Sequence, residues 1–235
     1  MDSSLEFVSS LSECHAIVEQ GEYANDGPLN SLSRIVDSRE RDGRELLIMH
    51  LDINSLLHKF EDLKLLISDF KAQVIFLLET KIDSSYPSKQ FTIDGYNIYH
   101  KDCVKGGGGV MAYVSSSLAS KKLKLPRNIT TFEALALESK FRRHDAVVLG
   151  IYRPLKAVGK DYYNRLESDL SDITPWASLQ RQLIVVTGDL NMDRLKPGEK
   201  EGKILRDLEQ IHNLGANKSD QNKSNLLGCY DDKHT

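Results

Sequence analysis

LIVVTGDLNMD, residues 183–193, is the stretch that decides the fold. Its apolar run is rich in Val and Ile, which predicts a buried strand, and the Gly-Asp-Leu-Asn that follows predicts an abrupt end to it. Asp189 and Asn191 stand two residues apart, and alternate residues of an extended chain point to the same face. The sequence therefore predicts a carboxylate and an amide side by side at the tip of a core strand.

Strands and helices account for most of the chain on either side of this strand. Residues 54–70, NSLLHKFEDLKLLISDF, repeat apolar side chains at helical spacing, which predicts an amphipathic helix between two buried strands. Helices flanking many mixed strands predict an α+β fold built as a layered sandwich. Further helices are predicted at residues 161–179 and 200–214, and strands at residues 45–53, 73–80, 96–101, 109–114, 132–139, 146–152 and 182–188.

The composition is typical of one globular domain preceded by a polar segment. The chain has 235 residues, of which 40% are hydrophobic and 28% are charged. Residues 1–44 lack clear periodicity and contain turn-like stretches, so we expect a poorly ordered lead-in there. Residues 45–235 are expected to form the domain.

The sequence gives no sign of export or membrane insertion. The first twenty residues carry acids and lack a cationic start, and apolar runs such as VIFLL are too short to cross a bilayer. Cys14, Cys103 and Cys229 are widely spaced, which indicates free thiols in a reducing compartment. We therefore expect an intracellular protein, nuclear or cytoplasmic, with no membrane partner, and the oligomeric state stays open.

The charge distribution is uneven along the chain. A net charge of −3 argues against an indiscriminate polyanion binder. Residues 101–143 nevertheless contain nine Lys or Arg against three acidic residues. This basic strip is compatible with contact to a nucleic-acid backbone, and a solvated loop region explains it equally well.

Polar side chains stand at the ends of four predicted strands: Asn54, Glu79, Tyr152, and the pair Asp189 and Asn191. Open sheets place their ligands at strand ends. Because these groups are carboxylates, amides and a phenol without His or Cys, they favour Mg²⁺ over zinc.

Each of these residues also has a structural interpretation. Asn54 precedes a helix and is a candidate N-cap. Glu79 could open a loop, and Asp189 with Asn191 could form an Asx turn. Tyr152 could be a core aromatic residue with a satisfied hydroxyl. The repetition of the pattern after four apolar runs favours a shared site.

In these motifs the chain resembles the endonuclease/exonuclease/phosphatase superfamily. The resemblance is closer to the apurinic-endonuclease-like endonuclease domain of non-LTR (LINE-type) retrotransposons, and it covers residues 46–214. The motifs that carry it, in order, are LDINSLLHKFEDLKLLISDF (51–70), ETK (79–81), GGGV (107–110), YRP (152–154) and GDLN (188–191).

The resemblance implies a four-layer α/β/β/α sandwich of the DNase I type and metal-dependent nicking of DNA. Glu79 would ligate a catalytic Mg²⁺, with Mn²⁺ as an alternative, and Asn54 would support the metal and the phosphate. Asp189 would orient or deprotonate the attacking water. Asn191 and Tyr152 would hydrogen-bond the scissile phosphate and stabilise its developing charge.

Basic residues provide the expected DNA contacts. Arg153 is a predicted phosphate contact, for which a surface ion pair is the alternative, and Lys121 and Lys122 belong to the basic strip. DNA is thus the expected partner. Residues 105–110, KGGGGV, lack the Lys-Ser/Thr of a P-loop and sit between strands, so we expect a loop entering a strand and no nucleotide cofactor.

The terminal Ser-Asp-His of the family is missing. Asp232 and His234 in YDDKHT are no substitute, because no apolar strand precedes them. We therefore expect a domain that is incomplete at its C-terminus, lacks its last strands and has impaired or no activity. Two alternatives stay open: a phosphatase of the same fold that acts on inositol or lipid phosphates, and a non-enzymatic remnant that binds nucleic acid.

Overall fold

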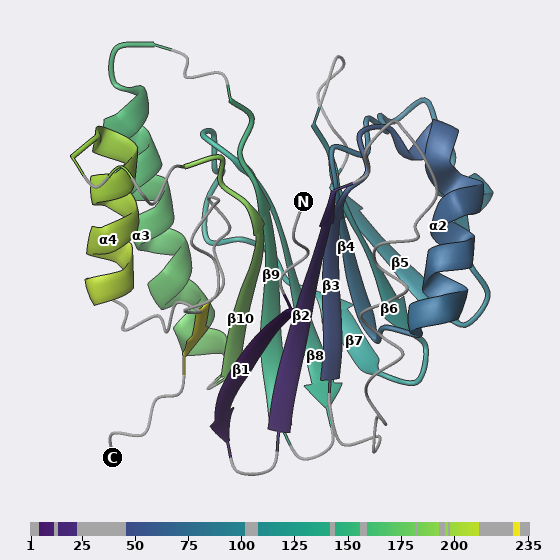
Figure 1. The fold of residues 1–235 in the computed structure, drawn as a ribbon. Coiled ribbons are helices and arrows are strands. Elements are labelled where there is room, and N and C mark those ends of the chain that lie inside the picture. Colours follow the sequence, from purple (N-terminus) through teal and green to yellow (C-terminus); the bar gives the residue numbers. More distant parts are fainter. Residues whose placement is uncertain are drawn as a thin grey trace. The chain divides into compact units, whose positions relative to one another are not determined.

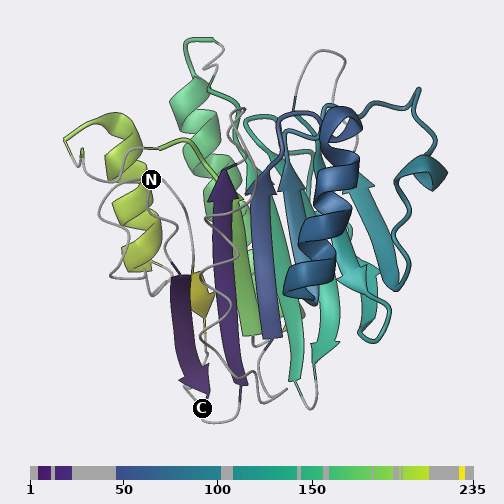
Figure 2. The same cartoon turned by 45° about the vertical axis from the view of Figure 1, so that its right-hand side comes forward.

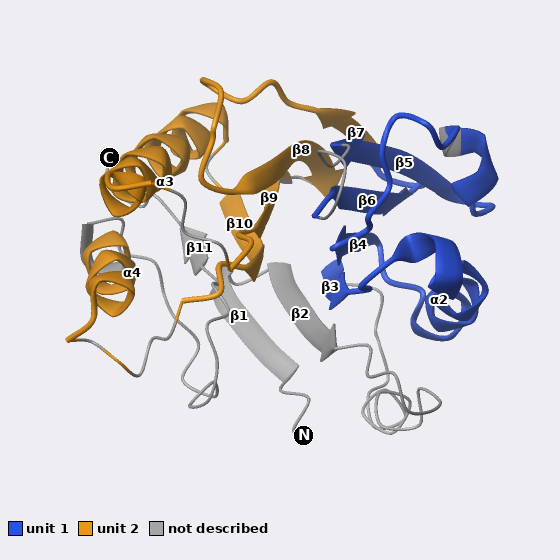
Figure 3. Cartoon of the chain, turned by 90° about the horizontal axis from the view of Figure 1, so that it is seen from above, with its two compact units in different colours: residues 1–118 blue, residues 119–235 orange. Residues whose placement is uncertain are grey.

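Two mixed β-sheets carry the fold, one in each half of the chain (Figure 1). The chain divides into two compact units, residues 1–118 and residues 119–235, which Figure 3 colours separately. The computed structural model describes residues 5–11, 14–22, 46–101, 108–141, 144–155, 159–181, 183–192, 196, 198–211 and 228–230.

The first unit contains a six-stranded sheet in the order β1-β2-β3-β4-β6-β5. Strands β2, β3 and β4 run parallel to one another, and β1, β6 and β5 add antiparallel partners at the two sides. The strands are β1 (Leu5–Leu11), β2 (Cys14–Glu22), β3 (Leu46–Asp52), β4 (Val74–Leu78), β5 (Tyr96–Lys101) and β6 (Val110–Ser115).

Helix α2 (Leu56–Phe70) connects β3 to β4 and lies along one face of this sheet in Figures 1 and 2. Its buried side chains lie on one face of the helix and pack on alternate residues of β3, β4 and β6. The helix ends at Lys71, whose left-handed backbone donates its N–H to the Ile67 carbonyl at 2.9 Å. A 3₁₀ turn, η1 (Ser88–Phe91), precedes β5 and accepts the Tyr113 hydroxyl at the Phe91 carbonyl.

The second unit contains a five-stranded sheet in the order β11-β10-β9-β8-β7. Strands β9 and β10 are parallel, and the other pairs in this sheet are antiparallel. The strands are β7 (Ala119–Lys122), β8 (Glu133–Phe141), β9 (His144–Tyr152), β10 (Leu183–Asp189) and β11 (Gly228–Tyr230).

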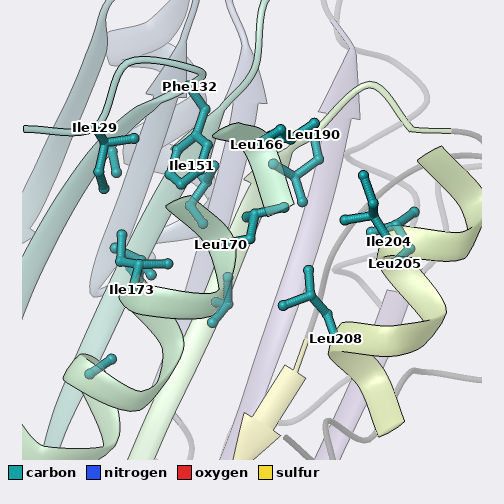
Figure 4. Packing of buried hydrophobic residues seen from close by; sticks show 14 of the residues in the cluster. Ile129, Phe132, Ile151, Leu166, Leu170, Ile173, Leu190, Ile204, Leu205 and Leu208 are labelled. Atoms are coloured by element: carbon teal, nitrogen blue, oxygen red, sulfur yellow. The ribbon is translucent and has the colours of Figure 1, made fainter. Parts of the chain in front are cut away.

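Helices α3 (Tyr162–Gln180) and α4 (Lys200–Ile211) cover one face of the second sheet (Figure 1). Their apolar residues pack with alternate residues of β8, β9 and β10 in one cluster. Figure 4 shows Ile204, Leu205 and Leu208 of α4 turned toward α3. Burial of each such side chain contributes about 1.5–3 kcal/mol, so the amphipathic helices are held on the sheet mainly by this cluster.

A buried carboxylate anchors the loop before β8 to α3. Asp169 is 3% exposed and accepts hydrogen bonds from the Thr130 and Thr131 N–H groups and from the Thr131 hydroxyl. Arg127 completes the arrangement with an ion pair to Asp169 at 3.0 Å. A buried charge of this kind is stable because every side of it is hydrogen-bonded or paired.

The predicted fold class is confirmed, since two mixed sheets with flanking helices are present. Strands β1 and β2 lie within residues 1–44, and the division into a lead-in and a domain from residue 45 onward stays a prediction. Strands β1, β2, β7 and β11 are not among the predicted strands. Pairing with another strand defines them rather than local periodicity. Asp232 and His234 lie outside the described residues. No helix among those described has the length and apolar character needed to span a bilayer.

Candidate functional site

In the first unit, the predicted site residues Asn54 and Glu79 lie on neighbouring loops. Parallel pairing of β3 and β4 brings both carboxyl ends to the same edge of the sheet. The loops that follow are joined by main-chain hydrogen bonds from Ser55 N to the Glu79 carbonyl, 2.8 Å, and from Leu56 N to the Thr80 carbonyl, 2.9 Å. The structure therefore brings these two residues together.

Both loops have an unusual backbone. Asn54, Ser55, Glu79 and Lys81 have φ values of 43°, 91°, 53° and 54°, in the left-handed region that non-glycine residues rarely occupy. Such residues cost about 1–3 kcal/mol each and cluster at functional sites. The local strain supports the assignment of this edge as a site.

The alternative interpretation of Asn54 as a helix cap is wrong. The N-cap of α2 is Ser55, which makes no side-chain capping hydrogen bond. The Asn54 side-chain oxygen instead accepts a hydrogen bond from the Lys81 ammonium. The backbone N–H of Asn54 donates to Asp52 Oδ1 at 3.1 Å. Asn54 is exposed at the edge of the sheet, and its side-chain amide does not cap α2.

Two residues that the sequence analysis missed join this group. Asp52 ends β3 and pairs in register with Leu78, the residue before Glu79. Lys81 ends the ETK motif and reaches across to the Asn54 amide. The register of parallel strands was the available signal for Asp52, because it places the ends of both strands side by side.

The oxygen donors fit a hard divalent cation. Asp52 and Glu79 offer carboxylates and Asn54 an amide, and Mg²⁺ is usually held by one or two carboxylates together with waters and substrate oxygens. Within the described ranges, no group of three or more His, Cys, Asp or Glu is arranged to hold a metal. A cation that took the Asn54 oxygen would have to replace the Lys81 ammonium there.

In the second unit, strand register places three polar residues in a row. Asp189 at the end of β10 pairs with Tyr152 at the end of β9, and Tyr152 pairs with Glu133 at the start of β8. Register partners project to the same face. Since Ile151 packs on the helices, the row lies on the opposite face of the sheet. Tyr152 is 5% exposed, so its ring is part of the core.

Asp189 and Asn191 form the Asx turn that the sequence analysis left as an alternative. The Asn191 N–H donates to Asp189 Oδ1 at 2.6 Å, and Asn191 has a positive φ of 50°. The Asn191 side-chain amide donates to the Arg153 carbonyl at 2.7 Å. The turn thus fixes the orientation of both the carboxylate and the amide.

Gly188, just before this turn, lies against the backbone of β9. It has φ 128°, and a Cβ at this position would lie 1.9 Å from the Ile151 carbonyl oxygen. Only glycine fits, because a side chain would collide with the backbone of β9. The glycine of the GDLN motif therefore sets the approach of β10 to β9 just before Asp189.

Arg153 differs most from its predicted role. Arg153 is 1% exposed, and its guanidinium donates hydrogen bonds to the carbonyls of Leu190 and Asn191 and to Glu201 on α4. This burial fits a structural position better than a phosphate contact or a surface ion pair. The short YRP motif does not predict that the Arg153 side chain is buried.

Lys121 and Lys122 lie away from this row. They are exposed on the edge strand β7, where Lys121 forms an ion pair with Glu138 at 3.2 Å. Lys122 pairs in register with Leu137, four residues along β8 from Glu133, a separation of roughly 14 Å at 3.4 Å per residue. Neither lysine therefore lies next to the row of Asp189, Tyr152 and Glu133.

No protein-family model and no curated protein matches this sequence. Solved structures with a similar fold do exist. An AP endonuclease from Archaeoglobus fulgidus is 14% identical, with a TM-score of 0.50 over 78% of this chain and 86% of that chain. AP endonuclease LMAP from Leishmania major is 14% identical, with a TM-score of 0.50 over 69% of this chain and 65% of that one. The 3′ phosphatase NExo from Neisseria is 17% identical, with a TM-score of 0.48 over 72% and 76%.

These likenesses concern the backbone, since the sequence identities are low. Both AP endonucleases share the arrangement of elements found here. The chain has two mixed sheets with flanking helices, and its fold is the DNase I-like α/β fold.

Proposed function

We propose that this chain hydrolyses phosphodiester bonds in DNA with the help of a divalent metal ion, as a nicking endonuclease of the non-LTR retrotransposon type. The observation that carries the proposal is the turn at the end of β10, which holds Asp189 and Asn191 beside Tyr152. The same fold in AP endonucleases supports it.

In the reaction, Asp189 accepts a proton from water, whose oxygen forms a new bond to phosphorus while the bond to the leaving oxygen breaks. Asn191 and Tyr152 donate hydrogen bonds to phosphate oxygens, whose negative charge increases in the transition state. Glu79, Asn54 and Asp52 would hold Mg²⁺. When bound, the ion supplies positive charge that neutralises the phosphate.

Lys121 and Lys122 are proposed to contact the DNA backbone away from the scissile bond. Their distance from the row of Tyr152 and Asp189 favours flanking phosphates. Replacement of both by Ala should weaken DNA binding and reduce the salt dependence of the binding constant, because fewer counterions are released. The measurement is the slope of the logarithm of the DNA-binding constant against the logarithm of the salt concentration.

The deciding experiment is nicking of supercoiled plasmid by the purified chain, with Mg²⁺ or with EDTA. The proposal expects nicking that needs the metal and is lost in Asp189→Ala, while Asp94→Ala, which removes an exposed carboxylate, keeps it. Folded wild-type protein that leaves the plasmid intact would contradict the proposal.

The chemistry of the row also suits a phosphomonoester, which is the second candidate function. Hydrolysis of inositol phosphates with no nicking of plasmid would favour a phosphatase. Salt-sensitive DNA binding that persists in Glu79→Ala, without turnover of either substrate, would favour a binding protein.

A further inference from the structure

Arg153 has the largest fully buried side chain in the described part of the chain, although it is a cation in a loop. Burial of a charge is costly unless the charge is paired and hydrogen-bonded. A buried Arg that follows directly after a proposed site residue, Tyr152, therefore needs a reason. Its contacts supply one.

The guanidinium of Arg153 joins three separate segments. Nε donates to the Leu190 carbonyl, and Nη2 donates to the Asn191 carbonyl and to Glu201 Oε1, the latter at 2.9 Å. Nη1 lies 3.4 Å from the Tyr162 hydroxyl on α3. The planar group thus connects the turn after β10 to both helices.

The main chain of Arg153 holds the same turn from the other side. Its N–H donates to the Asp189 carbonyl at 2.8 Å, and its carbonyl accepts from the Asn191 side-chain amide at 2.7 Å. Asp189, Leu190 and Asn191 are therefore each bonded to Arg153. A single residue fixes the whole turn.

We propose that Arg153 is a positioning residue that sets the geometry of Asp189 and Asn191 for the reaction, with Glu201 of α4 as its counter-ion. This inference rests on the proposed function. Glu201 compensates the buried charge, as its side chain is only 24% exposed. Through this ion pair, helix α4 is coupled to the turn that carries the general base.

The first test replaces Arg153 by Lys in the full chain. Lysine keeps the positive charge but cannot make the planar set of hydrogen bonds. In plasmid nicking, kcat should fall on the order of 10²-fold while KM changes little, because misplacement of a reacting group slows the chemical step. The matched control is Arg181→Lys, which alters another Arg–Glu pair of the same unit, that with Glu138 at 2.7 Å, and should keep wild-type kcat.

A second variant separates positioning from stability. Arg153→Met combined with Glu201→Leu removes both charges and keeps apolar volume, a change that often preserves stability. We expect this double variant to unfold cooperatively at a somewhat lower midpoint, because the Leu190 and Asn191 carbonyls lose their donor, and to keep the low kcat. A folded double variant with wild-type kcat would overturn the inference.

A readout independent of activity distinguishes this inference from the proposed function. Amide hydrogen exchange at Asn191 should become at least about tenfold faster in Arg153→Lys, since the amide is held in the turn, and should not change in Arg181→Lys. If the wild type nicks no plasmid, the proposed function fails, and the exchange rates still decide whether Arg153 orders the turn. Unchanged exchange at Asn191 in Arg153→Lys would refute the positioning role.

Discussion

The main-chain N–H of Asn191 donates a 2.6 Å hydrogen bond to Oδ1 of Asp189. One carboxylate oxygen is therefore committed to shaping the turn. An Asn at position 189 would also offer an Oδ1 acceptor to the Asn191 N–H, but it would not be basic. The shape of the turn and the basicity of the carboxylate can therefore be tested separately.

Asp189→Asn should slow catalysis strongly and leave the fold intact. The new side chain can still accept the Asn191 N–H, but it cannot take a proton from water. General-base catalysis contributes about 10²–10⁴-fold, so the rate of plasmid nicking should fall by that factor. The thermal unfolding midpoint should stay at the wild-type value. A variant that nicks at the wild-type rate would exclude Asp189 as the base.

Mg²⁺ should stabilise the protein through Glu79. A ligand at ten times its Kd adds about 1.4 kcal/mol to the free energy of unfolding, which corresponds to roughly 3–5 °C for a chain of this length. Calorimetry with Mg²⁺ and with EDTA should show this gain in the wild type and its loss in Glu79→Gln. Glu61→Gln, an exposed position on α2, should respond like the wild type. An equal gain in all three proteins would place the ion elsewhere.

Gly188→Ala should destabilise the second unit strongly. Positive φ costs about 1–3 kcal/mol for a non-glycine residue, and overpacking against the backbone adds about 1–3 kcal/mol. Urea unfolding should therefore show a loss of about 2–6 kcal/mol in the free energy of unfolding, by the sum of these two effects.

Two other glycines calibrate that result. Gly95 has φ 81° with open space around it, so Gly95→Ala should show the cost of the backbone alone. Gly198 has an ordinary φ and open space, so Gly198→Ala should be nearly neutral. A Gly188→Ala variant as stable as Gly198→Ala would show that β9 and β10 can move apart.

His50 should make the first unit sensitive to acid. Burial lowers the pKa of this imidazole from 6.5 to about 4, and the side chain is 4% exposed on β3. Between those two pH values the unfolded state binds more protons than the folded state, so the free energy of unfolding falls as the pH falls. The full loss is about 3 kcal/mol on the scale of 1.36 kcal/mol per pKa unit.

Urea unfolding between pH 7 and pH 4 in wild type and His50→Gln measures this contribution. The variant should have a flatter profile, since it keeps a polar side chain that does not titrate. His58→Gln on the exposed side of α2 retains the buried imidazole and should keep the wild-type profile. Identical profiles in wild type and His50→Gln would refute the assignment.

Much of the fold follows from local patterns in the sequence. The apolar period of α2 and the continuous apolar runs of β4 and β10 are local signals, and they correspond to the helix and the strands of the structure. Strand β7 has only four residues, three of them polar, and is a strand because Lys121 and Lys122 pair with β8. Such pairing is a long-range property that a local pattern does not contain.

The candidate site divides in the same way. Asp189 and Asn191 could be selected because their spacing is a property of one short stretch. Arg153 could not, since its burial depends on Leu190 and on Glu201, which is 48 residues away. The clash that excludes a side chain at position 188 likewise arises from a neighbouring strand.

Strained backbone, with positive φ at non-glycine residues, is concentrated where the proposed chemistry takes place. Glycine would adopt positive φ without strain, so replacement of such a residue by glycine would make the native backbone easier to form. Directed evolution for heat resistance alone would therefore accumulate glycine at the strand ends and lose catalysis as it gained stability. Positions that resist this drift under a combined screen would identify the side chains on which the reaction depends. Five of the six non-glycine residues with positive φ in the described ranges follow β3, β4 or β10: Asn54, Ser55, Glu79, Lys81 and Asn191.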